Sequence, residues 1–181
     1  MKLRFAALML AASLPLLSAH AAPKKQPAPA CPAEVSLPPA LADWRHVAEN
    51  ETIYADGDGN ITAWLPLGAA RTRLPLHKFE SLRYSVAPER EPDVFLFGGM
   101  VPIEVKKAGR LTVALDSGAW IDLVREGHAQ KSVGHDHGPA CSGIRKMVDF
   151  DVAPGRYLLQ IVNAPTATIH AMAVLKENPA R

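Results

Sequence analysis

Two imidazoles and a thiol lie within one short segment, His135-Asp136-His137-Gly138-Pro139-Ala140-Cys141. Side chains of an extended segment alternate between faces, so the rings of His135 and His137 would lie on one side and suit a transition metal. An iron oxygenase site would need a carboxylate or a further ligand from elsewhere in the chain, whereas a Cys141 thiolate would suit copper or zinc. The glycines and the proline around the histidines are equally typical of a solvated loop that binds nothing. Both interpretations stay open.

The chain has two cysteines, Cys31 and Cys141. Two cysteines in an exported protein usually pair, which predicts a disulfide between them. Such a bridge would close a loop of about 110 residues, for which chain entropy gives roughly 4–5 kcal/mol as an upper figure. A disulfide would remove Cys141 as a thiolate ligand and leave His135 and His137 free to bind.

Two further side chains are candidates for ligand binding. Trp120 follows the turn Asp116-Ser117-Gly118 directly into an expected strand, where it either stacks on a ligand or fills the core. Arg145 and Lys146 have the pattern of the exposed edge of a strand, although Arg145 lies near the histidine segment, where its guanidinium could hold an anionic group.

The N-terminal segment has the pattern of a cleavable export signal. Lys2 and Arg4 precede an apolar run over 5–17, which is too short to span a bilayer, and Ala19-His20-Ala21 fits the small-x-small cleavage rule. We therefore expect a mature chain that begins at Ala22, in the periplasm or outside the cell. No later stretch is long and apolar enough to predict a membrane span.

Composition narrows the class of protein. The formal net charge of +2 falls close to zero once Lys2 and Arg4 are removed, and no basic run with interleaved aromatics predicts nucleic-acid binding. Sixteen prolines and twelve glycines favour many turns and short strands. We expect a Pro/Ala-rich leader over 22–40 and one domain over 41–181.

Alternating polar and apolar residues recur between turn signals through this domain. The pattern predicts an all-β fold, a single jelly-roll-like β-sandwich of about 8–9 short antiparallel strands. A short helix is expected within 41–50. The expected strands cover 69–76, 81–86, 94–105, 110–115, 120–125, 144–152, 156–162 and 168–175.

Several runs carry a resemblance to known proteins. The hairpin around Pro154-Gly155 resembles one found in secreted β-sandwich modules, including carbohydrate-binding ones. Over roughly 88–175, the runs 117–122, 135–141 and 144–150 resemble a family of short exported proteins from α-proteobacteria that are labelled homogentisate 1,2-dioxygenase. The resemblance implies an iron-dependent oxygenase, with His135-x-His137 as the first half of a cupin metal motif. Cys141 stands where that motif has a carboxylate, and no His follows Pro154-Gly155 where the second half needs one.

Together these patterns predict an exported, non-catalytic binding or accessory module. Its ligand would be a small molecule, a glycan or a protein, bound at the end that carries the 135–141 segment and Trp120. The first alternative is a small metal-dependent dioxygenase, and the second is a periplasmic copper or zinc binding protein. The cofactor of either alternative would be a transition metal, namely iron, copper or zinc, held by His135 and His137.

Overall fold

The computed structural model describes residues 30–52 and 63–177 and is mostly β-sheet. The chain divides into two units, 1–30 and 31–181, and the description below concerns the second. The predicted signal peptide over 1–21 and the leader residues 22–29 lie outside the described residues. Within the described ranges, no helix has the length and apolarity that crossing a bilayer requires.

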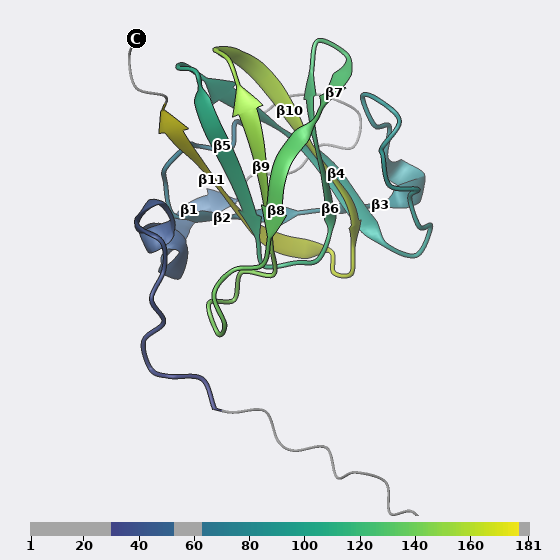
Figure 1. Cartoon of the computed structure of the whole chain (residues 1–181). Coiled ribbons are helices and arrows are strands. Elements are labelled where there is room, and N and C mark those ends of the chain that lie inside the picture. Colours follow the sequence, from purple (N-terminus) through teal and green to yellow (C-terminus); the bar gives the residue numbers. More distant parts are fainter. Residues whose placement is uncertain (1–29, 53–62, 178–181) are drawn as a thin grey trace, which may run out of the picture. The chain divides into compact units, whose positions relative to one another are not determined.

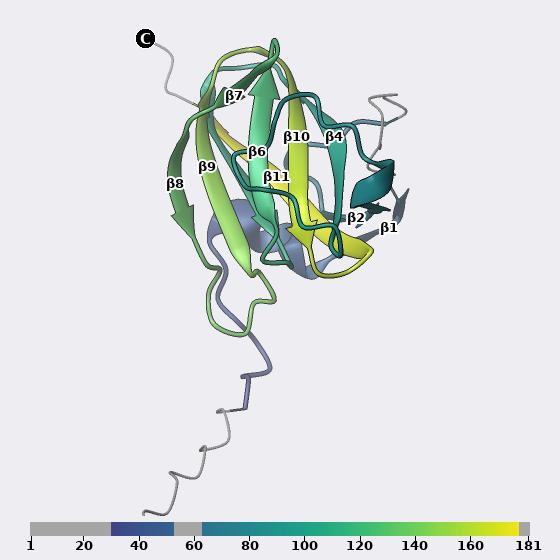
Figure 2. The ribbon, with the colours of Figure 1, turned by 90° about the vertical axis from the view of Figure 1, so that its right-hand side faces the viewer.

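The described strands form two sheets that face each other (Figures 1 and 2). All ladders between these strands are antiparallel except the parallel pair β1–β2. The first sheet has the order β1 (Val47–Thr52), β2 (Arg71–Pro75), β11 (Thr168–Glu177), β5 (Gly109–Leu115), β9 (Lys146–Val152) and β8 (Ser132–Asp136). The second has the order β3 (His77–Lys78), β4 (Phe97–Val105), β10 (Gly155–Ala164), β6 (Trp120–Arg125) and β7 (His128–Gln130).

The core lies between the inner faces of these sheets, where every second side chain points inward. Leu159 and Ile161 of β10 and Leu111 and Val113 of β5 are fully buried in one cluster with inward residues of the other strands. Burying such a side chain contributes about 1.5–3 kcal/mol each relative to leaving it in water. The predicted all-β sandwich is therefore confirmed. The described ranges hold eleven strands, more than the 8–9 expected, because short strands such as β3 carry no pattern of their own.

The short helix expected within 41–50 is present, but it begins and ends earlier than expected. A 3-10 helix, η1 (Pro39–Arg45), begins at a proline, and β1 follows it. Leu41 and Trp44 are spaced for the three-residue turn of a 3-10 helix, and both are buried against Met172 and other residues on the outer face of the first sheet. The tertiary contact thus selects the tighter helix.

The predicted strand over 81–86 is also wrong, because this segment belongs to an irregular connection between η2 (Phe79–Ser81) and β4. The Tyr84 hydroxyl donates to the Ile161 carbonyl at 3.0 Å. The side chain of Gln160, which is fully buried, exchanges two hydrogen bonds with the backbone of Val86. The Gln160 side chain of the second sheet and the segment's own Tyr84 hold it in place, so its alternating pattern does not reflect pairing with a neighbouring strand.

Candidate functional site

A cavity of about 180 Å³ lies where β6 of one sheet faces β8 and β9 of the other. This space corresponds to about six water molecules at their volume in liquid water. We call it the Trp120 cavity, since Trp120 forms one wall together with apolar residues of β9. Its polar lining consists of Glu89, Asp122, Gln130, Ser132, His135 and Lys146.

The strand topology leaves this cavity open. β7 pairs with β6 only over Leu123–Arg125, at the end near the tight turn that joins the two strands. Glu126 and Gly127 in that turn both have positive φ, as a two-residue hairpin turn requires. The chain then leaves the second sheet and joins the first as β8, as Figure 2 shows. The described strands therefore leave the 120–122 half of β6 without a neighbour on this side.

Trp120 and Asp122 form a hydrogen-bonded pair on one face of β6. They are two residues apart, so both side chains leave the strand on the same side, and the Trp120 indole Nε1–H donates to Asp122 Oδ1 at 2.7 Å. Asp122 Oδ2 accepts from the backbone N–H of Glu89 at 3.3 Å, and the residue is only 3% exposed. Burial raises the pKa of the Asp122 carboxyl above its ordinary value of 3.8, although the hydrogen bond from Trp120 opposes the shift.

Lys146 is the cationic member of the site. It begins β9, and its ammonium nitrogen lies 4.6 Å from the centre of the Trp120 ring. Partial burial, followed by the nearby charge of Arg90, lowers the pKa of Lys146 from its ordinary value of 10.5, and attraction to Asp122 opposes this. No side chain or carbonyl of the described residues accepts a hydrogen bond from this ammonium, and no carboxylate lies within ion-pair distance.

The two predicted histidine ligands have different surroundings. His135 stands opposite Val148 in the β8–β9 ladder, and opposite residues share a face, so His135 lines the cavity beside Val148. His137 lies past the end of β8, where its Nδ1 contacts the carbonyl oxygen of Arg145 at 2.7 Å. Of this pair, only His135 lines the cavity.

Arg145 lies outside the cavity lining. Its backbone N–H donates to the Leu115 carbonyl at 2.8 Å, and its side chain is exposed. Its backbone thus anchors the loop that precedes β9, and the predicted anion-binding role of its guanidinium stays a prediction.

The predicted disulfide is confirmed. Cys31 and Cys141 are bonded, with their Cα atoms 5.6 Å apart and a sequence separation of 110. Beside Cys141, the Ser142 carbonyl accepts a hydrogen bond from the Trp44 indole at 3.1 Å. The disulfide and this bond fasten the loop between β8 and β9 to the segment that precedes and includes η1.

The donor set for a metal ion is incomplete in the described ranges. The disulfide removes the Cys141 thiolate. Among the described residues, no three His, Cys, Asp and Glu side chains are grouped closely enough to hold a metal ion. These residues do not supply the three-ligand set that an iron oxygenase needs. Metal binding at His135 and His137 remains a prediction from sequence.

Sequence reasoning missed Asp122 and Lys146. The spacing Trp120-x-Asp122 in an expected strand was a usable signal, because it places an acid beside an indole on one face. Lys146 gave no such signal, because it reads with Arg145 as the exposed start of a strand. Only the packing of β9 against β6 shows that it is half-buried over Trp120.

Comparison with known proteins adds no family to this description. No protein-family model matches the chain, and no curated protein matches it in sequence. The fold and the geometry of the site therefore carry the functional argument.

Proposed function

We propose that this protein is a non-catalytic binding module that holds a small, hydroxyl-rich neutral molecule, such as a sugar unit, in the Trp120 cavity. The observation that carries the proposal is a buried carboxylate and a half-buried ammonium on one small cavity, both with hydrogen-bonding capacity to spare.

The spare capacity lies on both sides of the cavity. A carboxylate accepts about four hydrogen bonds, whereas Asp122 accepts two from the described residues. An ammonium donates three, and Lys146 donates none to the described residues. Leaving such groups unmet away from water is costly, so a ligand that both donates and accepts is favoured. A hydroxyl group does both.

The charge of the cavity argues against a strongly charged ligand. Glu89 and Asp122 are acidic and Lys146 is basic, so a bound anion would meet the carboxylates and a bound cation would meet the ammonium. A neutral hydroxylated molecule satisfies both kinds of group without adding charge. Gln130 and Ser132 extend the same chemistry, because an amide and a hydroxyl each donate and accept.

The size and shape of the Trp120 cavity limit the size of the ligand. The cavity of about 180 Å³ takes one ring or a short polyol, and is smaller than the pockets of about 300–1,000 Å³ that hold drug-sized ligands. The Lys146 ammonium covers one face of the Trp120 ring, so recognition on that face relies on hydrogen bonds rather than on ring stacking.

The compartment forms part of the proposal. Disulfides persist in oxidising environments, so the Cys31–Cys141 bridge supports export to the periplasm or the exterior. The signal-peptide pattern over 1–21 points the same way. The dioxygenase and the copper or zinc alternatives gain no support from the donor set, and we derive no metal-dependent step.

A protein-observed NMR titration with glucose, galactose, mannose, N-acetylglucosamine and myo-inositol tests the proposal on the disulfide-bonded protein. At least one of these compounds should bind saturably and shift the Trp120 indole N–H signal, which a Trp120→Phe variant assigns. Lys146→Gln should weaken that binding by about tenfold, since a charge-assisted hydrogen bond is lost.

Lys131→Gln is the matched control. Lys131 is an exposed lysine between β7 and β8 that is outside the cavity lining, and its replacement removes the same charge. Equal affinities for the two variants, or no binding of any of the five compounds, would overturn the proposal.

A further inference from the structure

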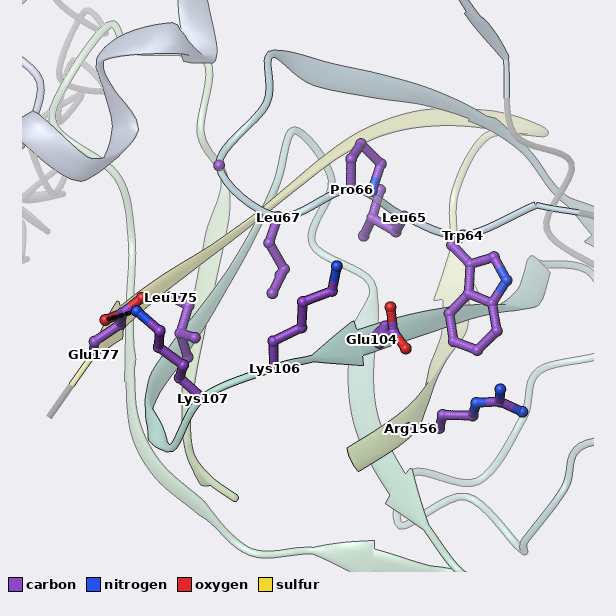
Figure 3. A pocket seen from close by; sticks show the side chains of 11 residues that line it. Trp64, Leu65, Pro66, Leu67, Glu104, Lys106, Lys107, Arg156, Leu175 and Glu177 are labelled. Carbon is purple, nitrogen blue, oxygen red and sulfur yellow. Dashed lines mark hydrogen bonds and ion pairs between the residues drawn. The ribbon is translucent and has the colours of Figure 1, made fainter. Parts of the chain in front are cut away.

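A second concavity lies at the opposite end of β10 (Figure 3). Arg156 near the start of this strand pairs with Glu104, and Val162 near its end pairs with Trp120. Six residues of strand separate these two ends, or about 20 Å at the rise of an extended chain. The second site has a volume of about 720 Å³ and is independent of the Trp120 cavity. We call it the Trp64 groove.

The segment 64–68 builds one wall of the groove. The Leu65 N–H donates to the Pro102 carbonyl of β4 at 2.8 Å, and the Gly68 N–H donates to the Ala173 carbonyl of β11 at 2.9 Å. Leu65 is 2% exposed, which fixes the segment to the core. The groove therefore lies across the mouth between the two sheets, with an apolar surface that includes Leu67 and Leu175.

The charges in the groove are unequally paired. Lys107 and Glu177 form an ion pair at 3.0 Å, so each of these charges has a partner of opposite sign. Arg156 lies opposite Glu104 in the ladder, yet its guanidinium carbon lies 5.5 Å from the centre of the Trp64 ring, and no ion pair joins it to a described carboxylate.

Lys106 is the second cation of the groove, and Figure 3 shows it extending from the end of β4 towards the segment 64–68. It likewise has no carboxylate partner among the described residues. The groove thus offers two cations, Lys106 and Arg156, against the single remaining carboxylate of Glu104.

Trp64 differs from the other tryptophans in having an exposed ring. It is 37% exposed, and no described residue accepts a hydrogen bond from its indole N–H. The indoles of Trp44 and Trp120 donate to Ser142 and Asp122. An exposed indole beside unpaired cations and leucine side chains suits a ligand with an apolar body and an anionic end.

We propose that the Trp64 groove binds an organic anion that carries an apolar chain or ring. A carboxylate or phosphate group contacts Arg156 and Lys106, and the apolar body lies on Trp64, Leu67 and Leu175. The planar guanidinium of Arg156 can form two parallel hydrogen bonds with such a group. Its contact with the Trp64 ring keeps the guanidinium in position.

Titration of the disulfide-bonded protein with octanoate, 1-octanol and inorganic phosphate tests the two halves of this proposal. The readout is the indole N–H signal of Trp64 in a nitrogen–proton correlation spectrum, assigned with Trp64→Phe. Octanoate should shift this signal saturably and leave the Trp44 and Trp120 signals in place. Octanol and phosphate should each bind at least about tenfold more weakly, because each lacks one of the two contacts.

Two arginine variants of matched charge and one carboxylate variant sharpen the test. Arg156→Ala should weaken octanoate binding by about tenfold. Arg110→Ala should leave it unchanged, since Arg110 is paired with Asp151 at 2.7 Å outside the groove. Glu104→Gln should strengthen it, because the like charge is removed.

Each comparison has a result that would overturn one part of the proposal. Equal affinities for octanoate and octanol would overturn the anionic contact, and phosphate binding as tight as that of octanoate would overturn the apolar contact. Equal effects of Arg156→Ala and Arg110→Ala would overturn the assignment to this groove. None of these results bears on sugar binding in the Trp120 cavity.

Discussion

The Trp120 cavity and the Trp64 groove use the same three kinds of residue in opposite ways. Each has a tryptophan under a cation, at 4.6 Å for Lys146 over Trp120 and at 5.5 Å for Arg156 over Trp64, and each has a carboxylate nearby. Asp122 in the cavity is 3% exposed and accepts two hydrogen bonds. Glu104 in the groove is exposed and accepts none from the described side chains and backbone.

This difference shows that residue type alone does not define a site. In the cavity, burial away from water makes each hydrogen bond strong and each unmet polar group costly, so the ligand must match donors with acceptors. In the open groove, water screens the charges, so apolar area and a well-aligned guanidinium carry the binding. Burial in the cavity and exposure in the groove therefore separate a hydrogen-bonding site from an amphipathic one.

Removal of the disulfide should have the largest effect. The pair Cys31→Ser and Cys141→Ser should lower the free energy of unfolding by about 3–5 kcal/mol, because a loop of this length is freed in the unfolded chain. Urea unfolding of the double variant and of the oxidised protein measures the difference. The loop that Cys141 fastens leads into Lys146, so the indole signal of Trp120 should move and that of Trp64 should stay. A shift of Trp64 alone would contradict this.

The next largest effect is expected from truncating the carboxylate of each site, which should change the free energy of unfolding by different amounts. Asp122→Ala should cost about 1–3 kcal/mol, because the Trp120 indole and the Glu89 N–H lose their buried acceptor. Glu104→Ala should change stability by less than about 0.5 kcal/mol, as expected for an exposed side chain away from structural contacts. Thermal and urea unfolding of both variants provide the comparison. Equal losses would show that Asp122 is no more embedded than Glu104.

The smallest expected effect is the change in stability as the Asp122 carboxyl titrates in acid. Burial raises the pKa of Asp122, so the folded protein keeps this proton to higher pH than the unfolded chain does. The contribution of this protonation to the free energy of unfolding is therefore complete below pH 3.8, and it is lost as the pH rises through the raised pKa of Asp122.

The Trp120 indole N–H, which donates to Asp122, should report this step, and its signal should titrate with a midpoint above pH 3.8. The Trp64 signal should not follow it, because its indole has no described carboxylate acceptor. A Trp120 midpoint at or below pH 3.8 would show that solvent reaches the carboxyl freely. Asp122→Ala, in which the step must vanish, is the control.

The sequence by itself determined the fold class and the covalent link. Alternating residues in segments such as 110–115 and 156–162 correspond to β5 and β10, because one buried face imposes a period of two wherever a strand forms. Two cysteines beside an export pattern allowed one pairing, which the structure contains. Trp120, a ligand-binding candidate from sequence, lines a cavity, and its part in binding stays a prediction.

Only the tertiary structure decided which polar side chains meet. Lys146 reaches Trp120 because β9 and β6 belong to different sheets that face each other at one edge, and β7 stops short of covering that edge. The 81–86 segment reads as a strand but is held by Tyr84 and Gln160 instead. Periodicity is local, whereas the register and the uncovered edges of distant strands are set by contacts across the whole domain.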